Sequence, residues 1–346
     1  MNLITSIIIG FGVVGPIHHD KMQGIENVQV IGVIDIDPLK KNKITAKNLP
    51  AYLSMEELSI DVTPQIWDVC VPTESHLFVI RQIIARDPKA HIIVEKPVCL
   101  HHQIPELREA LKGFQGRIVV NENYLSSEIT KKVKEIALEE LKIEPRRIVV
   151  EMDKNRSRDF QNGRFIDTEG ALKYEGTHMV TILKGIGEQF CPRVQVRKNY
   201  GDAFIPECLL HQGFADITYQ QDGVDVQLFT SMVGGVCNHY LPYDISSMPT
   251  EDTASRYRVA AIEGSSKGES VTVVGFYEPI RGFQRGQGAV AVIKEGKVVS
   301  IFEPIQDDTM GAHLKRAVHY LAYGEENPCP VEKGIEAVEM LTQMLP

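Results

Sequence analysis

A glycine-rich turn near the N-terminus has the residue types and spacing of a dinucleotide-binding site. Gly10, Gly12 and Gly15 form the pattern G-x-G-x-x-G directly after an apolar run and before a helical pattern. The first glycine permits a tight turn, the second lets the backbone approach a pyrophosphate, and the third allows close packing of helix on strand. We therefore expect six consecutive residues to bind the cofactor: Gly10, Phe11, Gly12, Val13, Val14 and Gly15.

An acidic residue 20 positions after Gly15 indicates which dinucleotide binds. Asp35 ends the second apolar run, where its carboxylate can accept hydrogen bonds from the adenosine ribose hydroxyls. The same charge would repel the 2′-phosphate of NADP, so the sequence favours NAD. Ile36 is expected in the same site, and Asp37 is an alternative partner for the ribose. A glycine turn in an α/β protein that binds no nucleotide is the competing interpretation.

The elements that position these residues alternate along the first third of the chain. Continuous apolar runs predict strands, and helical patterns lie between them at 77–86 and 104–112. Apolar strands separated by helices are typical of a parallel sheet covered on both faces. We therefore predict an α/β, doubly wound Rossmann domain over residues 1–123. The predicted strands are at 7–9, 28–34, 67–71, 91–94 and 117–120.

After Asn123 the pattern changes to longer strands in which apolar and polar residues alternate, as in an antiparallel sheet. We predict a C-terminal α+β domain over 124–346, with a large, mainly antiparallel sheet that binds substrate and forms oligomers. Its C-terminal helix is expected to pack back on the first domain. The predicted strands are at 147–152, 213–220, 224–232, 257–263 and 270–277, and the predicted helices at 126–141, 169–187, 311–323 and 331–345.

Polar residues follow two neighbouring predicted strands, at the sheet edge where α/β proteins bind ligands. One strand is followed by Pro72-Thr73 and then His76, and the next by Glu95-Lys96-Pro97. Together with the glycine turn, Asp35 and a later Glu122-Asn123-Tyr124, this order resembles the Gfo/Idh/MocA oxidoreductases. The resemblance runs nearly end to end and includes residues 327–332.

The resemblance implies an NAD-dependent dehydrogenase that acts on a CH–OH group of a sugar, sugar phosphate, amino sugar or cyclitol. It implies that Lys96 is the active-site lysine and that a cis peptide precedes Pro97. An ammonium group there can stabilise an alkoxide as hydride moves. A surface lysine before a turn proline is the alternative. The expected cofactor contacts at the strand ends are Pro72, Thr73, His76, Glu95, Lys96 and Asn123.

The segment from Gly170 to His178 resembles the catalytic helix of the family, which implies that His178 is the general acid and base. Tyr174 stands one turn earlier, where sugar and cyclitol dehydrogenases commonly have an aspartate. Its phenol can orient or relay a proton but supplies no carboxylate charge. Glu175 points about 100° away on a regular helix. A buried core histidine is the alternative interpretation of His178.

The loop at 153–165 is rich in groups that form hydrogen bonds and is expected over the substrate. Its arginines can bind a phosphate, a carboxylate or several hydroxyls. A solvated loop with surface ion pairs is an equal alternative. The expected substrate contacts are Lys96, Tyr124, Arg156, Arg158, Arg164, Glu175 and His178.

Composition excludes several other classes of protein. The net charge is −9 and the basic residues are dispersed, which disfavours nucleic acid as a partner. The six cysteines include no C-x-x-C pair, which indicates a reducing, cytoplasmic location, and no apolar run approaches the length of a membrane span. The adjacent pairs His18-His19 and His101-His102 match no common metal site, so we predict no catalytic metal.

Two other functions remain open on the same fold. One is reduction of an imine or another non-sugar substrate, and the other is a catalytically silent protein that senses a ligand. Lys96 and His178 argue against both, whereas Tyr174 leaves the second open. The resemblance also implies a homodimer or homotetramer, formed through the open face of the C-terminal sheet.

Overall fold

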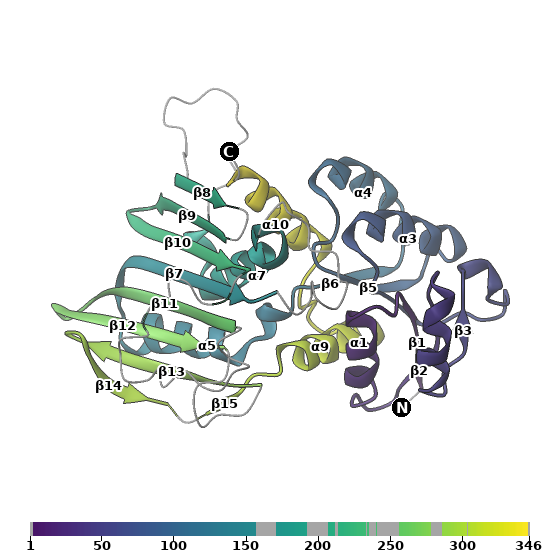
Figure 1. Cartoon of the computed structure of the whole chain (residues 1–346), viewed down its shortest axis with the longest axis horizontal. Coiled ribbons are helices and arrows are strands. Elements are labelled where there is room, and N and C mark those ends of the chain that lie inside the picture. Colours follow the sequence, from purple (N-terminus) through teal and green to yellow (C-terminus); the bar gives the residue numbers. More distant parts are fainter. Residues whose placement is uncertain are drawn as a thin grey trace. The chain divides into compact units, whose positions relative to one another are not determined.

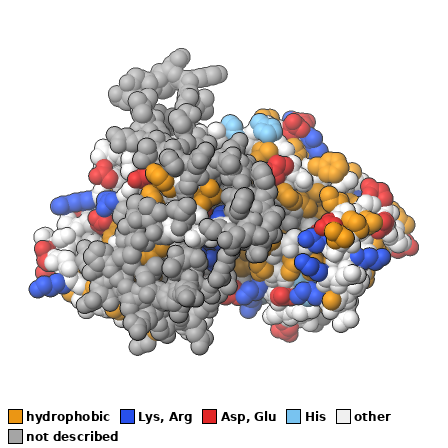
Figure 2. All heavy atoms as spheres, viewed as in Figure 1, with side chains coloured by type: hydrophobic (Ala, Val, Ile, Leu, Met, Phe, Trp, Pro, Cys, Tyr) orange, Lys and Arg blue, Asp and Glu red, His pale blue; other side chains and the backbone are white. Residues whose placement is uncertain are grey.

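A computed structural model of the chain describes residues 3–156, 171–191, 207–211, 214–232, 234, 240, 256–277, 286–302 and 304–344. The chain divides into two compact units (Figure 1), and Figure 2 draws the residues outside the described ranges in grey. The first comprises residues 1–126 and 310–339, and the second comprises 127–309 and 340–346. The boundary lies three residues beyond the predicted one. Residues 310–339, which we predicted in the second domain, belong to the first unit.

The first unit contains a six-stranded parallel sheet with the order β3-β2-β1-β4-β5-β6. This is the strand order of a Rossmann fold, so the predicted doubly wound sheet is confirmed. The strands are β1 (Ile4–Ile9), β2 (Val28–Ile34), β3 (Ala51–Tyr52), β4 (Ile66–Val69), β5 (His91–Glu95) and β6 (Arg117–Asn121). The helices are α1 (Val14–Met22), α2 (Lys41–Thr45), α3 (Thr73–Arg86), α4 (Ile104–Ala110), α9 (Thr309–Tyr323) and α10 (Val331–Gln343).

Helices cover both faces of this sheet, and the side chains of each strand alternate between the two faces. Ile7 and Ile9 belong to a core that includes residues of α3, α4 and α10, such as Ile80, Leu107 and Ile335. Ile8, between them, belongs to a second core that includes residues of α1 and α9. Helices on both faces explain why these strands are apolar throughout. The two C-terminal helices complete the covering.

The second unit is built on a nine-stranded, mainly antiparallel sheet. Its strands follow the order β14-β13-β12-β11-β7-β10-β9-β8, and β15 pairs with β13. Among the described strands of this second sheet, only β7 and β10 are paired in parallel. The strands are β7 (Glu144–Lys154), β8 (Glu207–His211), β9 (Phe214–Gln221), β10 (Val224–Ser231), β11 (Arg256–Ser266), β12 (Glu269–Phe276), β13 (Gln287–Lys294), β14 (Lys297–Ile301) and β15 (Ile305–Gln306).

Helices α5 (Glu128–Lys134) and α7 (Ala171–Ile186) pack against this sheet. Glycines make the contact with α5 close: a Cβ added at Gly275 would lie 2.7 Å from Ile129 Cγ2, and one added at Gly288 would lie 2.8 Å from Ile129 Cδ1. α5 continues into a π-helical turn at Glu135–Glu140. The helices predicted at 126–141 and 169–187 are therefore present in the described residues.

The other face of the sheet has its own apolar cluster. Val149, Ala261, Val274 and Ala291 are neighbours in register across β7, β11, β12 and β13, and all four are fully buried. This apolar surface is thus covered within a single chain. The predicted homo-oligomer stays a prediction. None of the described helices combines the length and apolarity needed to cross a membrane.

Candidate active site

The glycine turn after β1 has the geometry that its sequence predicts. Gly10 has a φ of 93°, and a Cβ added to it would lie 2.7 Å from the carbonyl oxygen of Cys70. A Cβ at Gly15 would lie 2.2 Å from the carbonyl oxygen of Gly10. A Cβ at Gly12 would meet nothing within 4 Å, so the backbone is open to a ligand there. The turn therefore fits a pyrophosphate.

Asp35 joins this turn to the end of β2. One carboxylate oxygen accepts a 2.6 Å hydrogen bond from the Phe11 amide, and the other accepts one of 2.9 Å from the Asp37 amide. A carboxylate has about four acceptor positions, so positions remain for ribose hydroxyls. The Asp37 carboxylate instead accepts from the Leu39 amide and caps a short helix. Asp35 is thus the better ribose partner of the two.

The other residues expected around the turn differ in exposure. Phe11 is buried and offers only its backbone, whereas Val13 and Ile36 are 49% and 87% exposed. Pro72 precedes α3, and Thr73 is its first residue. Asn123 and Tyr124 are buried in a short 3-10 turn at Asn123–Ser126. An exposed apolar side chain directly after Asp35 suits the flat face of an adenine.

His76 connects two strand ends instead of facing solvent. It is fully buried, with Nε2 2.9 Å from the Val71 carbonyl oxygen and Nδ1 2.9 Å from the Pro97 carbonyl oxygen. Burial lowers its pKa, and the two carbonyl contacts only partly oppose that effect. Its side chain therefore supports the cofactor edge, whereas we expected a direct cofactor contact.

The Glu-Lys-Pro segment has the expected backbone, because the Lys96–Pro97 peptide is cis. Lys96 is partly exposed, but Glu95 is turned into the unit. The Glu95 carboxylate accepts from His18 Nε2 at 2.9 Å and from the Asn121 amide. Burial opposes ionisation of Glu95, but the hydrogen bond and charge of His18 hold its pKa below the usual value. Glu95, like His76, was predicted to contact the cofactor, but its carboxylate binds His18 inside the protein.

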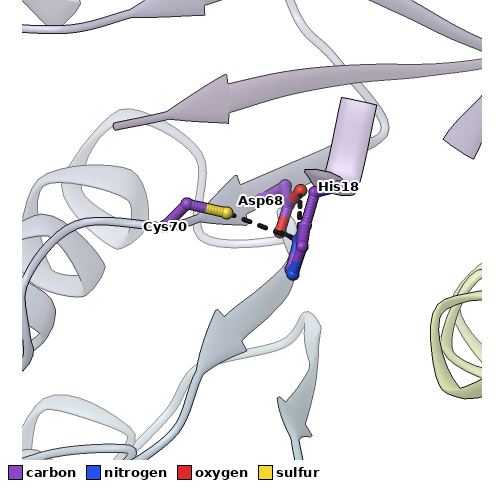
Figure 3. A group of neighbouring side chains, drawn as sticks. All are labelled: His18, Asp68 and Cys70. Carbon is purple, nitrogen blue, oxygen red and sulfur yellow. Dashed lines mark hydrogen bonds and ion pairs between the residues drawn. The ribbon is translucent and has the colours of Figure 1, made fainter. Parts of the chain in front are cut away.

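A buried cluster that the sequence analysis missed surrounds His18 (Figure 3). The imidazole of this α1 residue has Nδ1 2.9 Å from an Asp68 oxygen and 3.3 Å from Cys70 Sγ. Burial acts to lower the pKa of His18, but Asp68 and Cys70 outweigh it and raise the pKa well above the usual value. Burial and the charge of Asp68 raise the pKa of the Cys70 thiol to about 12.

The cluster also has a composition that transition metals use, since nitrogen, oxygen and sulfur atoms of His18, Asp68 and Cys70 lie within 4.8 Å of one another. Both ring nitrogens, however, face carboxylates at hydrogen-bond distances. One proton on each nitrogen satisfies these contacts. The signal in the sequence was Asp68, a carboxylate inside an otherwise apolar strand.

In the second unit, α7 carries Glu175 and His178. His178 is partly buried, and Glu175 is almost fully buried between two guanidinium groups. Arg156 donates to Glu175 Oε1 at 2.7 Å, and Arg258 donates to Oε2 at 3.0 Å. Two residues expected to bind substrate, Arg156 and Glu175, are thus bound to each other. Arg158, Arg164 and the side chain of Tyr174 lie outside the described residues.

Comparison with known proteins agrees with this site. Residues 4–121 match the model of an oxidoreductase family with an NAD-binding Rossmann fold, GFO_IDH_MocA. No curated protein matches the chain significantly.

Solved structures match the chain over nearly its whole length. A putative NADPH-dependent oxidoreductase from Desulfitobacterium hafniense is 12% identical, with a TM-score of 0.74 over 99% of this chain and 95% of that one. GenD2 from gentamicin A biosynthesis, solved with NAD, is 14% identical, with a TM-score of 0.71 over 99% and 93%. UDP-N-acetylglucosamine 3-dehydrogenase GnnA from Acidithiobacillus ferrooxidans is 13% identical, with a TM-score of 0.69 over 99% and 97%. At such identities the likeness shows the fold.

The matched segment contains the glycine turn, Asp35 and the Glu-Lys-Pro strand end, each in the geometry described above. Residues 4–121 of this chain therefore match the Gfo/Idh/MocA family of oxidoreductases with an NAD-binding Rossmann fold, and the solved structures above share its fold over nearly the whole chain.

Proposed function

We propose that the protein is an NAD-dependent dehydrogenase that acts on a hydroxyl-bearing carbon of a sugar derivative. The observation that carries the cofactor assignment is the Asp35 carboxylate, tied by the Phe11 amide to a glycine turn whose backbone is open at Gly12. A negative charge at this place favours a free ribose 2′-hydroxyl over a 2′-phosphate. NAD, when bound, supplies the acceptor or donor of hydride.

The side chains of the chain itself supply the proton transfer and the charge stabilisation. His178 takes the proton of the substrate hydroxyl as hydride leaves the same carbon, and it returns a proton in the reverse reaction. The Lys96 ammonium stabilises the negative charge that develops on that oxygen. Two of the similar structures support a sugar derivative as substrate, since one is named for gentamicin A biosynthesis and another as a UDP-N-acetylglucosamine 3-dehydrogenase.

Among the described residues, the two arginines beside Glu175 give no reason to require a phosphorylated substrate. Arg156 and Arg258 both donate to the buried Glu175 carboxylate, and only 11% and 12% of their side-chain surfaces are exposed. An incoming anion would have to displace an internal carboxylate to reach them. Neutral and anionic sugars therefore both belong in the substrate screen.

The test measures nicotinamide absorbance with NAD and NADP across sugars, sugar phosphates, amino sugars, nucleotide sugars and inositols. We expect reduction of NAD by at least one sugar derivative. His178→Asn and Lys96→Met should lower kcat by about 10²-fold or more. His102→Asn and Lys131→Met, which change exposed residues of the same types, are the matched controls.

Three results would contradict the proposal. Full turnover by His178→Asn or Lys96→Met would remove the assigned roles. A preference for NADP would contradict the role of Asp35. Tight NADH binding without reduction of NAD by any sugar would point to an imine reductase or a ligand sensor.

A further inference from the structure

The two residues next to Lys96 in the chain each contact a buried histidine. The preceding residue, Glu95, is bound through its carboxylate to His18 Nε2 at 2.9 Å. The residue that follows, Pro97, has its carbonyl oxygen 2.9 Å from His76 Nδ1. Both histidines are fully buried. The backbone of Lys96 is therefore held on both sides from within the first unit.

On the first side, His18 binds Glu95 as a doubly protonated ring. Its Nδ1 faces both Asp68 oxygens, at 3.0 and 2.9 Å, and its Nε2 faces Glu95. Ionised carboxylates accept hydrogen bonds and cannot donate them, so each ring nitrogen must carry a proton. The Asn121 amide donates to the same Glu95 oxygen. A charged donor and a neutral one thus fix the direction of the Glu95 side chain.

Glu95 fixes the point from which Lys96 leaves the sheet. It is the last residue of β5, and its carboxylate is turned toward His18, so the backbone that leads directly into Lys96 is held in one orientation. His18 lies on α1, the helix that the glycine turn begins. The same imidazolium therefore links the expected pyrophosphate site to the backbone that leads into Lys96.

On the second side, His76 fills the space between two strand ends. Its ring lies 2.9 Å from the Val71 carbonyl after β4 and 2.9 Å from the Pro97 carbonyl after β5. The side chain starts from the first turn of α3, so it fixes both carbonyls relative to that helix. Because the pKa of His76 is lowered, its neutral ring carries one N–H, which donates to one of the two carbonyl oxygens while the ring packs against the other. A donor-free side chain of similar size would remove that hydrogen bond.

We propose that His18 and His76 are positioning residues for Lys96, His18 acting through the Glu95 carboxylate and His76 through the Pro97 carbonyl. This inference rests on the proposed function, in which Lys96 is the residue that stabilises charge. Neither histidine touches the reacting atoms. Each acts by restricting where the lysine ammonium can lie.

The experiment compares six variants of the full chain. His18→Asn and Glu95→Met each break the first link, and Glu95→Met does so without leaving two buried carboxylates uncompensated. Glu95→Gln removes the same charge, but its amide oxygen can still accept from His18, so it is the charge-matched control. His76→Leu breaks the second link. The other controls are Asp68→Asn, which keeps the bond between His18 and Glu95, and His19→Asn, which changes an equally buried histidine of α1 whose partners are Asp20 and Gln23.

The first readout needs no substrate. Lysines are labelled with acetic anhydride at several pH values, and mass spectrometry gives the rate and apparent pKa of Lys96 relative to exposed Lys131. Glu95→Met and His76→Leu should change both quantities for Lys96, the former by more than Glu95→Gln does, and leave Lys131 unchanged. Asp68→Asn and His19→Asn should leave Lys96 as in the parent protein. NADH fluorescence and melting temperature show whether the first unit remains folded.

The second readout is turnover with the sugar derivative found in the screen. A displaced ammonium should lower kcat by about 10- to 100-fold in Glu95→Met and His76→Leu, with little change in the KM for NAD. If these variants match the controls in labelling and in kcat, the positioning role is wrong. If Lys96→Met retains turnover, the proposed role of Lys96 in catalysis is wrong. The labelling of Lys96 still decides separately whether His18 and His76 position it.

Discussion

The two units bury charge in opposite arrangements. In the first, one imidazolium lies between two carboxylates, those of Asp68 and Glu95. In the second, one carboxylate, that of Glu175, lies between the guanidinium groups of Arg156 and Arg258. The central group is buried in both clusters, whereas the outer groups Glu95, Arg156 and Arg258 keep 11%, 11% and 12% of their side-chain surfaces exposed.

The difference shows where each unit depends on pH. An arginine does not lose its proton in a protein, so the second cluster can lose charge only when Glu175 is protonated in acid. The central cation of the first cluster is a histidine, which loses its proton when the pH rises far enough. The unit that carries the cofactor residues is therefore sensitive at alkaline pH, and the cluster beside His178 is not.

The largest expected effect comes from removing the cation of the first cluster. His18→Asn leaves Asp68 and Glu95 facing each other without a positive charge between them, which should cost about 3 to 5 kcal/mol of unfolding free energy. Trp67, the single tryptophan, is buried in this unit and reports its unfolding in urea by fluorescence. If His18→Asn lowers the free energy of unfolding by no more than His19→Asn does, the buried cluster does not stabilise the first unit and the contrast between the two units is wrong.

A smaller effect is expected from removing the central charge of the second cluster. Glu175→Gln leaves two guanidinium groups close together, but the amide oxygen can still accept one hydrogen bond. Because that hydrogen bond remains, we expect about 2 to 3 kcal/mol, below the range for a buried pair that loses a partner outright. Thermal unfolding followed by circular dichroism measures it. Arg258→Met, which leaves a one-to-one pair, should cost less, and the opposite order would contradict this account of the cluster.

The pH dependence of stability sharpens the same comparison. The folded-state pKa of His18 is raised, so its stabilisation is complete below the unfolded pKa of about 6.5 and is lost as the pH rises through the folded pKa. Between these two pKa values, the parent protein should lose about 1.4 kcal/mol per pH unit relative to His18→Asn. The pKa of Glu95 is lowered, so its contribution is lost in acid. Urea unfolding from pH 5 to 10 tests this, and parallel curves for the two proteins would contradict it.

The sequence was informative where the chemistry is local. The glycine turn, Asp35, the Glu-Lys-Pro segment and the catalytic-helix pattern each occupy a few neighbouring residues, and strand period predicted both sheets. The buried clusters join residues far apart in the chain: His18 meets Asp68 50 positions away, and Arg258 meets Glu175 83 positions away. No periodicity encodes such pairs. For the same reason the sequence predicts a substrate contact for Arg156, although the chain itself supplies the carboxylate that it binds.

The smallest expected effect concerns a metal ion. The first cluster holds two negative groups for one positive group, and its His18, Asp68 and Cys70 atoms could ligate a cation if His18 Nδ1 and the thiol lost their protons. The Cys70 pKa of about 12 makes that loss costly near neutral pH, so a proton on His18 is favoured over a metal. A chelator should therefore leave turnover and melting temperature unchanged, and Co²⁺ should give no thiolate-to-cobalt absorption. Absorption that Cys70→Ser abolishes would instead assign the cluster to a metal and remove the imidazolium on which the comparison rests.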